Sequence, residues 1–485
     1  MTTTVENYPA VFGGQRRDAI SGETLDSVNP ATGEIIGRFP RCGKEDVDLA
    51  VQAAAKAGPD WAGLSTVDRA AYLRAIADVL RREGEALARL DAQDNGSTLN
   101  MLRVDVQHAV DQIEYFAGMA LHPMGDIIPT LPGRINYTIS QPWGVVARII
   151  PFNHPLMFAA AKMAAPLMAG NTLIIKPSEH TSLSALRLAD LLVDVLPAGV
   201  VNVVPGLGGE AGDALVTHPE IRRIAFIGSV PNGQLIQQRA AASGVKSVTL
   251  ELGGKNPLVV FPDADLDLAL DGAQRGMNFT WQGQSCGSTS RLLVHRDIHD
   301  EFVERLADRI DSLRPGLPEE ESSQTGAIVN QGQLDKVQSY IQIGKDEGAK
   351  LVAGGVRPDD PELARGLFIR PAVFDGVRAD SRLAQEEIFG PVLAVISFDD
   401  YQDALQIANG VSYGLTASVF TRDLTTAHTF AAEIEAGYVW VNDSSRHILG
   451  APFGGVKDSG IGREESAAEL ESYTQSKNIH VRYSY

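Results

Sequence analysis

The chain has 485 residues, 44% of them hydrophobic, which fits a globular protein of roughly two to four domains. It carries 42 basic and 61 acidic residues, and the resulting net charge of −19 argues against nucleic acid or an anionic membrane as a partner. Two cysteines cannot build a disulfide framework, and no basic-then-apolar leader opens the sequence, so a reducing cytoplasm is expected. The longest apolar run, residues 156–175, is broken by Lys162 and Pro166, so no membrane span is expected there.

Residues 1–40 have the turn signals of short strands joined by tight turns, such as Gly13-Gly14. From Lys44 the apolar residues recur at helical spacing, and the charged residues between them are expected on solvated faces. The predicted helices cover residues 47–57, 67–90 and 104–119. Residues 123–143 then interrupt this pattern, and 134–140 alternate like a strand with one solvated face. This excursion is too small for a domain and predicts an arm that pairs elsewhere.

Alternating strands and helices follow, which predicts a parallel sheet with helices on both faces. Buried strands are expected at residues 144–150, 171–176, 200–204, 224–227 and 248–251. Ligands bind outside the carboxyl ends of such strands. Those ends carry Asn153, Lys176, Glu179, Gly228, Ser229 and Glu251.

After Gly253-Gly254 the strand–helix pattern restarts, and a strand-like tail closes the chain. We therefore predict an α/β protein with three parts. A Rossmann-type domain comprises residues 1–122 and 143–253, a second α/β domain comprises 254–468, and a small β arm comprises 123–142 and 469–485.

Cys286 lies on a glycine-rich turn, between Gly283 and Gly287, just before the apolar strand that starts near Arg291. Glycines allow tight turns and close approach of a ligand, so the turn could display a nucleophile. A buried structural cysteine is the alternative, because free cysteines are among the most buried residues. Cys42, in a polar turn far from this stretch, receives no role.

Each of the other polar positions also has two interpretations. Glu251 is either a solvated surface acid or an acid with a function, since an unsolvated carboxylate at the end of an apolar strand is costly. Asn153 could donate to an oxyanion or simply stabilise its proline-flanked turn. Glu179 could accept ribose hydroxyls or interact with a helix N-terminus.

Seven stretches, in this order, resemble the NAD(P)-dependent aldehyde dehydrogenase superfamily from near the N-terminus to the end of the chain. They begin at Pro151 (PFNHP), Lys176 (KPSE), Phe226 (FIGS), Leu250 (LELGGK), Gly283 (GQSC), Glu387 (EIFGP) and Pro452 (PFGGVKDSG). The resemblance implies that an aldehyde is oxidised to a carboxylic acid. A coenzyme A-dependent acylating enzyme and a non-catalytic scaffold are the competing functions, and the intact reactive positions argue against the latter.

The resemblance assigns Cys286 as the nucleophile, which forms a thiohemiacetal and then a thioester. Asn153 and the Cys286 backbone N–H would hold the oxyanion, and Glu251 would activate the hydrolytic water. Family members that transfer to coenzyme A typically lack this glutamate. Lys176 joins the catalytic set and would also hold the adenosine ribose.

The resemblance also implies NAD as cofactor. Glu179 should repel a 2′-phosphate, so NADP is less favoured. No metal is expected. The candidate cofactor residues are Ile149, Pro151, Phe152, Lys176, Ser178, Glu179, Gly212, Phe226, Gly228, Ser229, Leu252, Gln333, Lys336, Glu387 and Phe389.

The aldehyde itself stays open among semialdehydes, aromatic aldehydes and betaine-type aldehydes. Met157, Arg446 and His447 are the candidate substrate residues, and Arg446 with His447 could favour a carboxylated aldehyde. A solvent-facing or intersubunit Arg446 is the alternative. His154 is expected to pack or to line the tunnel rather than to shuttle protons. The family assembles as dimers or as dimers of dimers, so a homodimer or homotetramer is expected, with the arm and the tail as pairing strands.

Overall fold

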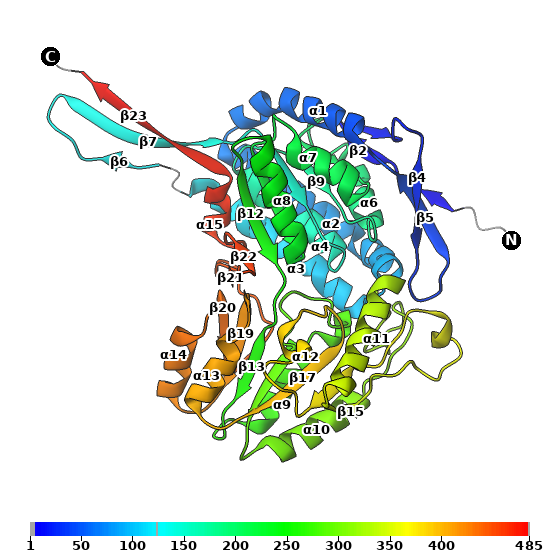
Figure 1. The fold of residues 1–485 in the computed structure, drawn as a ribbon. Coiled ribbons are helices and arrows are strands. Elements are labelled where there is room, and N and C mark those ends of the chain that lie inside the picture. The colour runs from blue at the N-terminus through cyan, green and yellow to red at the C-terminus, as the bar shows by residue number, and fades with distance from the viewer. Residues whose placement is uncertain (1–4, 123–124, 484–485) are drawn as a thin grey trace.

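A computed structural model describes residues 5–122 and 125–483 as two sheet-centred lobes with a projecting arm (Figure 1). The first sheet has the strand order β22-β12-β11-β8-β9-β10-β2-β3, and its central strands β12 to β10 are parallel. Its strands are β2 (Ala10–Phe12), β3 (Gln15–Arg17), β8 (Val145–Ile149), β9 (Thr172–Lys176), β10 (Val201–Val203), β11 (Arg223–Gly228), β12 (Ser247–Leu252) and β22 (Gly460–Ile461).

Helices cover both faces of this sheet, because alternate strand residues point to opposite sides and nearly all of them are apolar. One face packs against α2 (Thr66–Asn95), α3 (Leu99–Gly118), α4 (Pro155–Ala161), α5 (Ala164–Met168) and α6 (Leu183–Leu192). The other packs against α1 (Lys44–Gly63), α7 (Asp213–Thr217) and α8 (Val230–Ser243). The helical segment between β8 and β9 is divided into α4 and α5, since Pro166 has no N–H to bond the carbonyl of Lys162.

The expectation that helix charges are solvated is wrong at the end of α2. Asp91 and Asp94 are fully buried there, and Asp105 of α3 is buried beside them. Their carboxylates are used inside the protein, as described below.

The second sheet has the order β15-β16-β17-β14-β13-β19-β20. Its strands are β13 (Pro257–Val260), β14 (Arg291–His295), β15 (Lys350–Ala353), β16 (Ala372–Asp375), β17 (Val392–Phe398), β19 (Thr416–Phe420) and β20 (Tyr438–Val441). One face carries α9 (Leu266–Gly276) and α10 (His299–Asp311). The other carries α11 (Gln331–Asp346), α12 (Arg382–Gln385), α13 (Tyr401–Asn409) and α14 (Leu424–Glu433).

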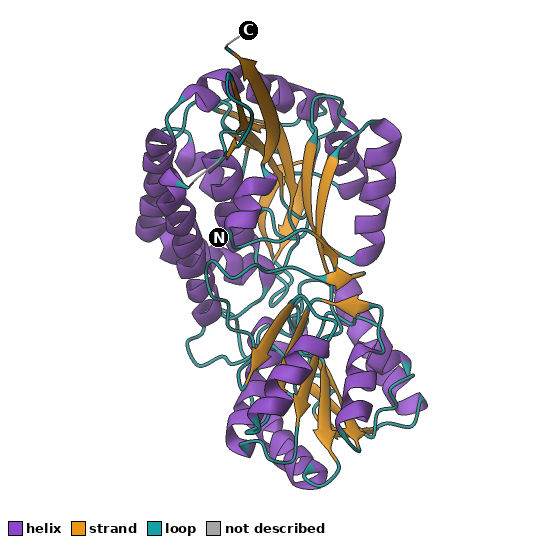
Figure 2. Ribbon diagram, turned by 90° about the vertical axis from the view of Figure 1, so that its left-hand side faces the viewer, coloured by secondary structure: helices purple, strands orange, loops and turns teal. Residues whose placement is uncertain are grey.

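Between the lobes, the strand ends of one sheet face the strand ends of the other (Figure 2). Only residues 253–256 separate the end of β12 from the start of β13, so the carboxyl edge of the first sheet faces the amino edge of the second. In the first sheet the chain passes from β8 to β9 and β10, then returns to β11 on the other side of β8. Such a switch point opens a crevice at the carboxyl ends of the strands, where ligands bind.

The arm is an antiparallel sheet of β23 (Thr474–Arg482), β7 (Arg134–Pro142) and β6 (Ile127–Ile128), reached from the first lobe through α15 (Ala467–Ser472). The predicted arm strand therefore pairs with the tail of its own chain. Among the described residues, no helix has the length and apolar character needed to cross a bilayer. Smaller sheets join β1 (Glu6–Asn7), β4 (Thr24–Val28) and β5 (Ile35–Pro40), and β18 (Tyr413–Gly414) with β21 (Val456–Lys457).

The predicted α/β class, with a Rossmann-type lobe, a second α/β lobe and a small β arm, is confirmed. One strand crosses the expected boundary. β22 comes from the range assigned to the second α/β domain, yet it pairs with β12 at the edge of the first sheet.

Candidate active site

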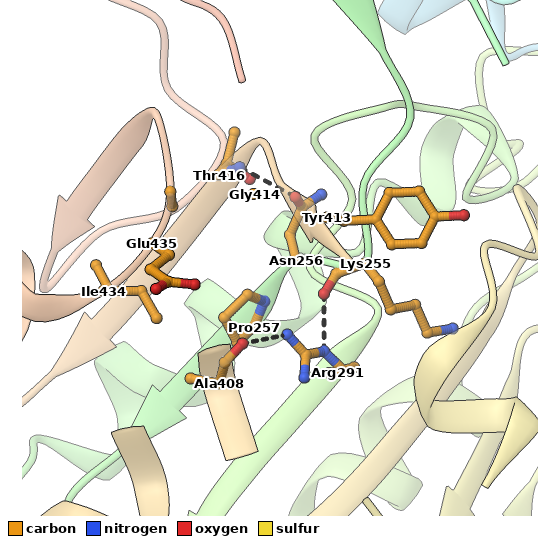
Figure 3. Close-up of a pocket in the computed structure, with 11 residues that line it drawn as sticks. Lys255, Asn256, Pro257, Arg291, Ala408, Tyr413, Gly414, Thr416, Ile434 and Glu435 are labelled. Atoms are coloured by element: carbon orange, nitrogen blue, oxygen red, sulfur yellow. Dashed lines mark hydrogen bonds between the residues drawn. The ribbon is translucent and has the colours of Figure 1, made fainter. Parts of the chain in front are cut away.

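Cys286 lies in a turn that hydrogen bonds hold against the second lobe. Asn256, in the link between the sheets, donates from Nδ2 to the carbonyls of Cys286 (2.8 Å) and Ser288 (2.9 Å). Its Oδ1 accepts the Thr416 N–H at 3.0 Å (Figure 3). One amide thus fixes the backbone at the cysteine and two residues after it relative to β19.

Arg291, the first residue of β14, anchors the other end of this turn. Its fully buried guanidinium donates to the carbonyls of Lys255 (2.7 Å) and Ala408 (2.7 Å), as Figure 3 shows, and to that of Ile407 (2.8 Å). Burial without a carboxylate partner lowers the pKa of Arg291 to about 9. The residue ties the link between the sheets to the end of α13.

The Cys286 thiol is held protonated at neutral pH. Burial raises its pKa to about 12, and the nearby carboxylates of Glu251 and Glu387 act in the same direction. The thiolate is the reactive form of cysteine, so this thiol needs a base or a positive charge before it attacks a carbonyl.

Glu251, near the end of β12, supplies a candidate base. The residue is 6% exposed, and within the described residues neither carboxylate oxygen has a hydrogen-bond partner. Burial and the charge of Glu464 raise its pKa well above the ordinary value. Gly454 makes room for it, because a Cβ at that glycine would lie 2.7 Å from Oε1. A buried carboxyl without partners needs a substrate or water to bond.

A buried charge cluster lies behind Glu251. Arg148 contacts Glu464 at 2.7 Å and Glu469 at 3.2 Å, and Lys162 contacts Glu464 at 2.8 Å. Arg148 also donates to the Tyr473 hydroxyl at 2.9 Å. The carboxylates of this cluster favour the neutral form of Glu251, whereas Lys162 favours the charged form.

Asn153 follows β8 in the loop that leads to α4. The residue is 3% exposed, and its Oδ1 has no hydrogen-bond partner within the described residues. Its neighbour His154 is bonded through Nδ1 to Asp105 at 2.8 Å, and the imidazole packs on Trp281 with ring centroids 5.4 Å apart. His154 is therefore part of the wall between the loop of Asn153 and the turn of Cys286.

The predicted adenosine residues lie at the end of β9. Lys176 Nζ contacts the carbonyl of Pro177 at 3.0 Å and the Glu179 carboxylate at 3.4 Å. Burial lowers the pKa of Lys176. Burial opposes ionisation of Glu179, but the charge of Lys176, the charge of His180 and local hydrogen bonds together outweigh it, and the pKa of Glu179 falls. Gly212, in the π-helical turn Gly208–Gly212, lies against the Lys176 side chain, since a Cβ there would be 3.5 Å from Cδ.

Ser229 is exposed and precedes α8, a helix of fourteen residues. The backbone N–H groups at the N-terminus of this helix are suited to binding phosphate. Gly228 is required for packing, because a Cβ there would overlap the ring of Phe226. Leu252 packs likewise on Gly233 of α8. Ile149 and Pro151 lie at the switch point, and Ser178 shapes the loop after β9 through its hydroxyl, which accepts the His180 N–H.

Glu387 and Phe389 approach the cysteine turn from the second lobe. They line one small cavity together with Ser285 and Gly283. The Glu387 carboxylate accepts the Gly254 N–H at 3.0 Å and lies against the Cα of Gly253, where no side chain would fit. Burial raises the pKa of Glu387.

Gln333 and Phe152 hold Phe389 in place. Gln333 donates to the carbonyls of Ile388 (2.9 Å) and Phe389 (2.7 Å), and the ring of Phe152 meets that of Phe389 edge-on at 5.6 Å. Lys336 is near Glu387, and burial lowers its pKa. Gln333 thus supports the turn of Phe389, where φ is +57°.

The candidate substrate residues are less concentrated. Met157 is half-buried against the core of the first lobe. Arg446 has a 67% exposed side chain, 3.7 Å from Asp443. His447 pairs with Glu465 at 3.0 Å and packs on Phe453 at 4.6 Å.

Several residues of the site carried no sequence signal that we used. Glu464 and Glu465 belong to a polar stretch that resembles an ordinary surface loop, and Lys162 entered only as a break in an apolar run. Only the burial of these three residues shows that they surround Glu251. Cys42, expected in a polar turn, is fully buried in the core on the α1 side of the first sheet. No group of three or more metal-binding side chains occurs in the part of the chain that the structure describes.

Known proteins are similar to this chain over nearly its whole length. A sequence model of the aldehyde dehydrogenase family matches residues 17–479. Aldehyde dehydrogenase tropH of Talaromyces stipitatus is 42% identical over 482 residues, covering 98% of this chain and 93% of the relative. The structure of PnpE from Pseudomonas sp. WBC-3 is 41% identical with a TM-score of 0.96, covering 99% of this chain and 98% of that one. The NAD+ complex of an aldehyde dehydrogenase from Bacillus cereus is 39% identical with a TM-score of 0.96, covering 99% and 97%.

The interpretation of both glycines beside Cys286 as room for ligands is wrong for Gly283. This residue has φ +65°, and a Cβ would overlap the Gly390 carbonyl, so its site is filled by protein. We predict that Gly283→Ala destabilises the fold by at least about 1–2 kcal/mol from the left-handed backbone alone. Nothing lies within 4 Å of a Cβ at Gly287, so Gly287→Ala should change stability by less than about 0.5 kcal/mol. Thermal melts of both variants check this, and equal losses would contradict it.

Glu251 should also make stability depend on pH. In the folded chain it keeps its proton above the ordinary pKa of 4.5, whereas the unfolded chain releases it. Stability therefore falls as pH rises from about 4.5 through the raised pKa. We predict that Glu251→Gln matches the wild type near pH 5 and exceeds it at pH 8 by on the order of 1–3 kcal/mol. Denaturant unfolding at both pH values measures this, and a variant less stable at pH 8 would refute it.

Proposed function

The chain belongs to the aldehyde dehydrogenase family and oxidises aldehydes, and from this premise we propose that it produces free carboxylic acids with NAD through a thioester on Cys286. One observation carries the proposal. Glu251 is a buried carboxyl without hydrogen-bond partners among the described residues. From the end of a strand in the first sheet, its charge raises the pKa of the Cys286 thiol. Nucleophile and base thus come from the two lobes.

In the first step the Cys286 sulfur bonds the aldehyde carbon, and the thiol proton passes to Glu251 directly or through water. The raised pKa of Glu251 suits it to receive that proton. The carbonyl oxygen becomes an oxyanion, which the Asn153 amide and the Cys286 N–H stabilise by donation. Within the described residues no acceptor occupies the backbone N–H of Cys286.

Loss of a hydride from the same carbon converts the thiohemiacetal to a thioester. NAD, when bound, supplies the acceptor of that hydride. Glu251 passes the thiol proton on to solvent and, once ionised again, takes a proton from water, whose oxygen attacks the thioester carbon. The carbon–sulfur bond breaks, the acid leaves, and the sulfur regains a proton. The ion pair of Lys162 and Glu464 lies next to Glu251 and offers the thiol proton a route from Glu251 to solvent.

The residues of the crevice fit a dinucleotide. Glu179 is partly exposed beside the buried Lys176 and can accept ribose hydroxyls, and Ser229 presents a helix N-terminus. Glu387 lies near Cys286, where it can accept hydroxyls of the second ribose. The ionised state of Glu179 also opposes a 2′-phosphate, which supports NAD over NADP.

The arm supports a homodimer or homotetramer. β23 forms one edge of its sheet and is mostly exposed, and Ile127 and Ile128 of β6, at the opposite edge, are 77% and 42% exposed. Open strand edges and exposed apolar residues of this kind are normally covered, and a second copy of the chain would cover them. The aldehyde stays unassigned among carboxylated, aromatic, aliphatic and cationic classes.

We predict that the purified protein forms NADH from at least one member of a panel covering these four classes, without coenzyme A. Cys286→Ala should abolish turnover, because no other described cysteine lies in the crevice. Ser288→Ala is a matched control on the same turn. Turnover strictly dependent on coenzyme A, or NADH formation by Cys286→Ala, would contradict the proposal.

Cofactor choice has its own test. Wild-type kcat/KM should be higher with NAD than with NADP. Glu179→Gln removes the negative charge and keeps the size of the side chain, so the preference should shrink about tenfold or more, since 1.4 kcal/mol corresponds to that factor. Glu210→Gln, which changes an exposed acid paired with Arg41, is the control. A preference unchanged in Glu179→Gln would exclude this role.

A further inference from the structure

The corner between α2 and α3 contacts both halves of the proposed catalytic machinery. Asn95, the last residue of α2, is fully buried. Its Nδ2 donates to the carbonyl of Phe152 at 2.7 Å and lies 3.4 Å from the carbonyl of Asn153. The loop that carries the proposed oxyanion donor is therefore held by one side-chain amide.

The acceptor end of the same amide leads to the cysteine turn. Asn95 Oδ1 accepts the Ser97 N–H at 3.1 Å and also the Ser97 hydroxyl. The Ser97 oxygen lies 3.3 Å from Oε1 of Gln282. Gln282 has φ +54°, a strained backbone for a side chain of this kind, and precedes Cys286 in the turn. A continuous row of polar contacts thus joins Asn153 to the turn of Cys286.

The corner itself has little freedom. Gly96 ends α2 with φ +86°, and its carbonyl accepts the Ala327 N–H of the second lobe at 2.9 Å. Earlier in the last turns of α2, the carboxylate of Asp91 accepts the Leu156 N–H of α4 at 3.0 Å. Asp94 accepts the Leu183 N–H of α6 at 3.1 Å. The loop between β8 and α4 is consequently held at its helix as well as at its carbonyls.

We propose that Asn95 is a positioning residue that sets the oxyanion donor Asn153 against the nucleophile Cys286. It touches neither substrate nor sulfur and acts through the loop of Phe152 and Asn153. The inference rests on the proposed roles of Asn153 and Cys286. It adds that the α2–α3 corner fixes their relative placement across the two lobes, because Ser97 and Gln282 continue the contact into the turn.

Asn95→Ala tests this, with Asn202→Ala as matched control. Asn202 on β10 is equally buried, its Nδ2 donates to the carbonyls of Leu173 (3.2 Å) and Gly199 (2.8 Å), and its Oδ1 accepts the Gly13 N–H at 2.9 Å. Each variant loses two donated contacts and one accepted backbone N–H, and Asn95→Ala also loses the contact with the Ser97 hydroxyl, so the two should lose similar stability. Only Asn95→Ala should lower kcat/KM for the aldehyde, by about tenfold or more, since small misplacements of reacting groups have such effects.

A double-mutant cycle with Asn153→Ala separates positioning from general damage. Asn153→Ala alone should lower kcat by about a hundredfold, the usual effect of losing one oxyanion donor. In that background Asn95→Ala should cost less than about twofold more, because its effect passes through Asn153. Asn202→Ala should behave alike in both backgrounds. Additive effects of Asn95→Ala and Asn153→Ala would overturn the inference.

A normal kcat for Asn153→Ala would instead refute the proposed oxyanion role, which distinguishes that failure from a failure of the inference. If Asn95→Ala does not fold, Asn95→Ser takes its place in the cycle. Serine keeps a polar group at the corner but is too short to reach the Phe152 carbonyl. The same coupling to Asn153 is expected, and its absence overturns the inference equally.

Discussion

The short link between β12 and β13 is the constraint on which the site depends. Residues 253–256 leave no room for the two sheets to separate, so the edge that binds ligands in one lobe faces the turn of Cys286 in the other. Asn256 in this link also holds the carbonyls around the cysteine. Glu251 lies two residues before this link, whereas Cys286 lies thirty residues after it and is tied to the link by the hydrogen bonds of Asn256. Chain connectivity places the base, and this long-range contact places the nucleophile.

The site is costly to maintain, because it buries charges and a neutralised acid in one place. Among the residues that the structure describes, Glu251 has no hydrogen-bond partner, and Arg148 with Lys162 must compensate the carboxylates behind it. Buried charges are stable only when they are paired with good geometry, and Glu464 provides this for both cations. The cluster favours the uncharged form of Glu251 but still allows it to ionise, and general-base chemistry requires the ionised form.

The parallel strands and the polar residues at their ends could be predicted from the sequence because buried parallel strands are continuous apolar runs and their loops carry the polar residues. The proposed roles of Cys286, Glu251 and Asn153 rest on that pattern and on the resemblance. Residues that act from other elements were not. The acids at the end of α2 look like any solvated helix face, and their burial depends on how α4 and α6 pack. The 3.6-residue period cannot distinguish a solvated acid from one that caps a neighbouring helix.

The central claim is that Glu251 hydrolyses a thioester on Cys286. Its most direct test is the mass of Glu251→Gln protein after mixing with NAD and a turned-over aldehyde, with the modified peptide located by sequencing. The account predicts about one acyl group per active site on the peptide that contains Cys286, formed together with a single burst of NADH. Continued turnover of this variant with an unmodified Cys286 would contradict the account.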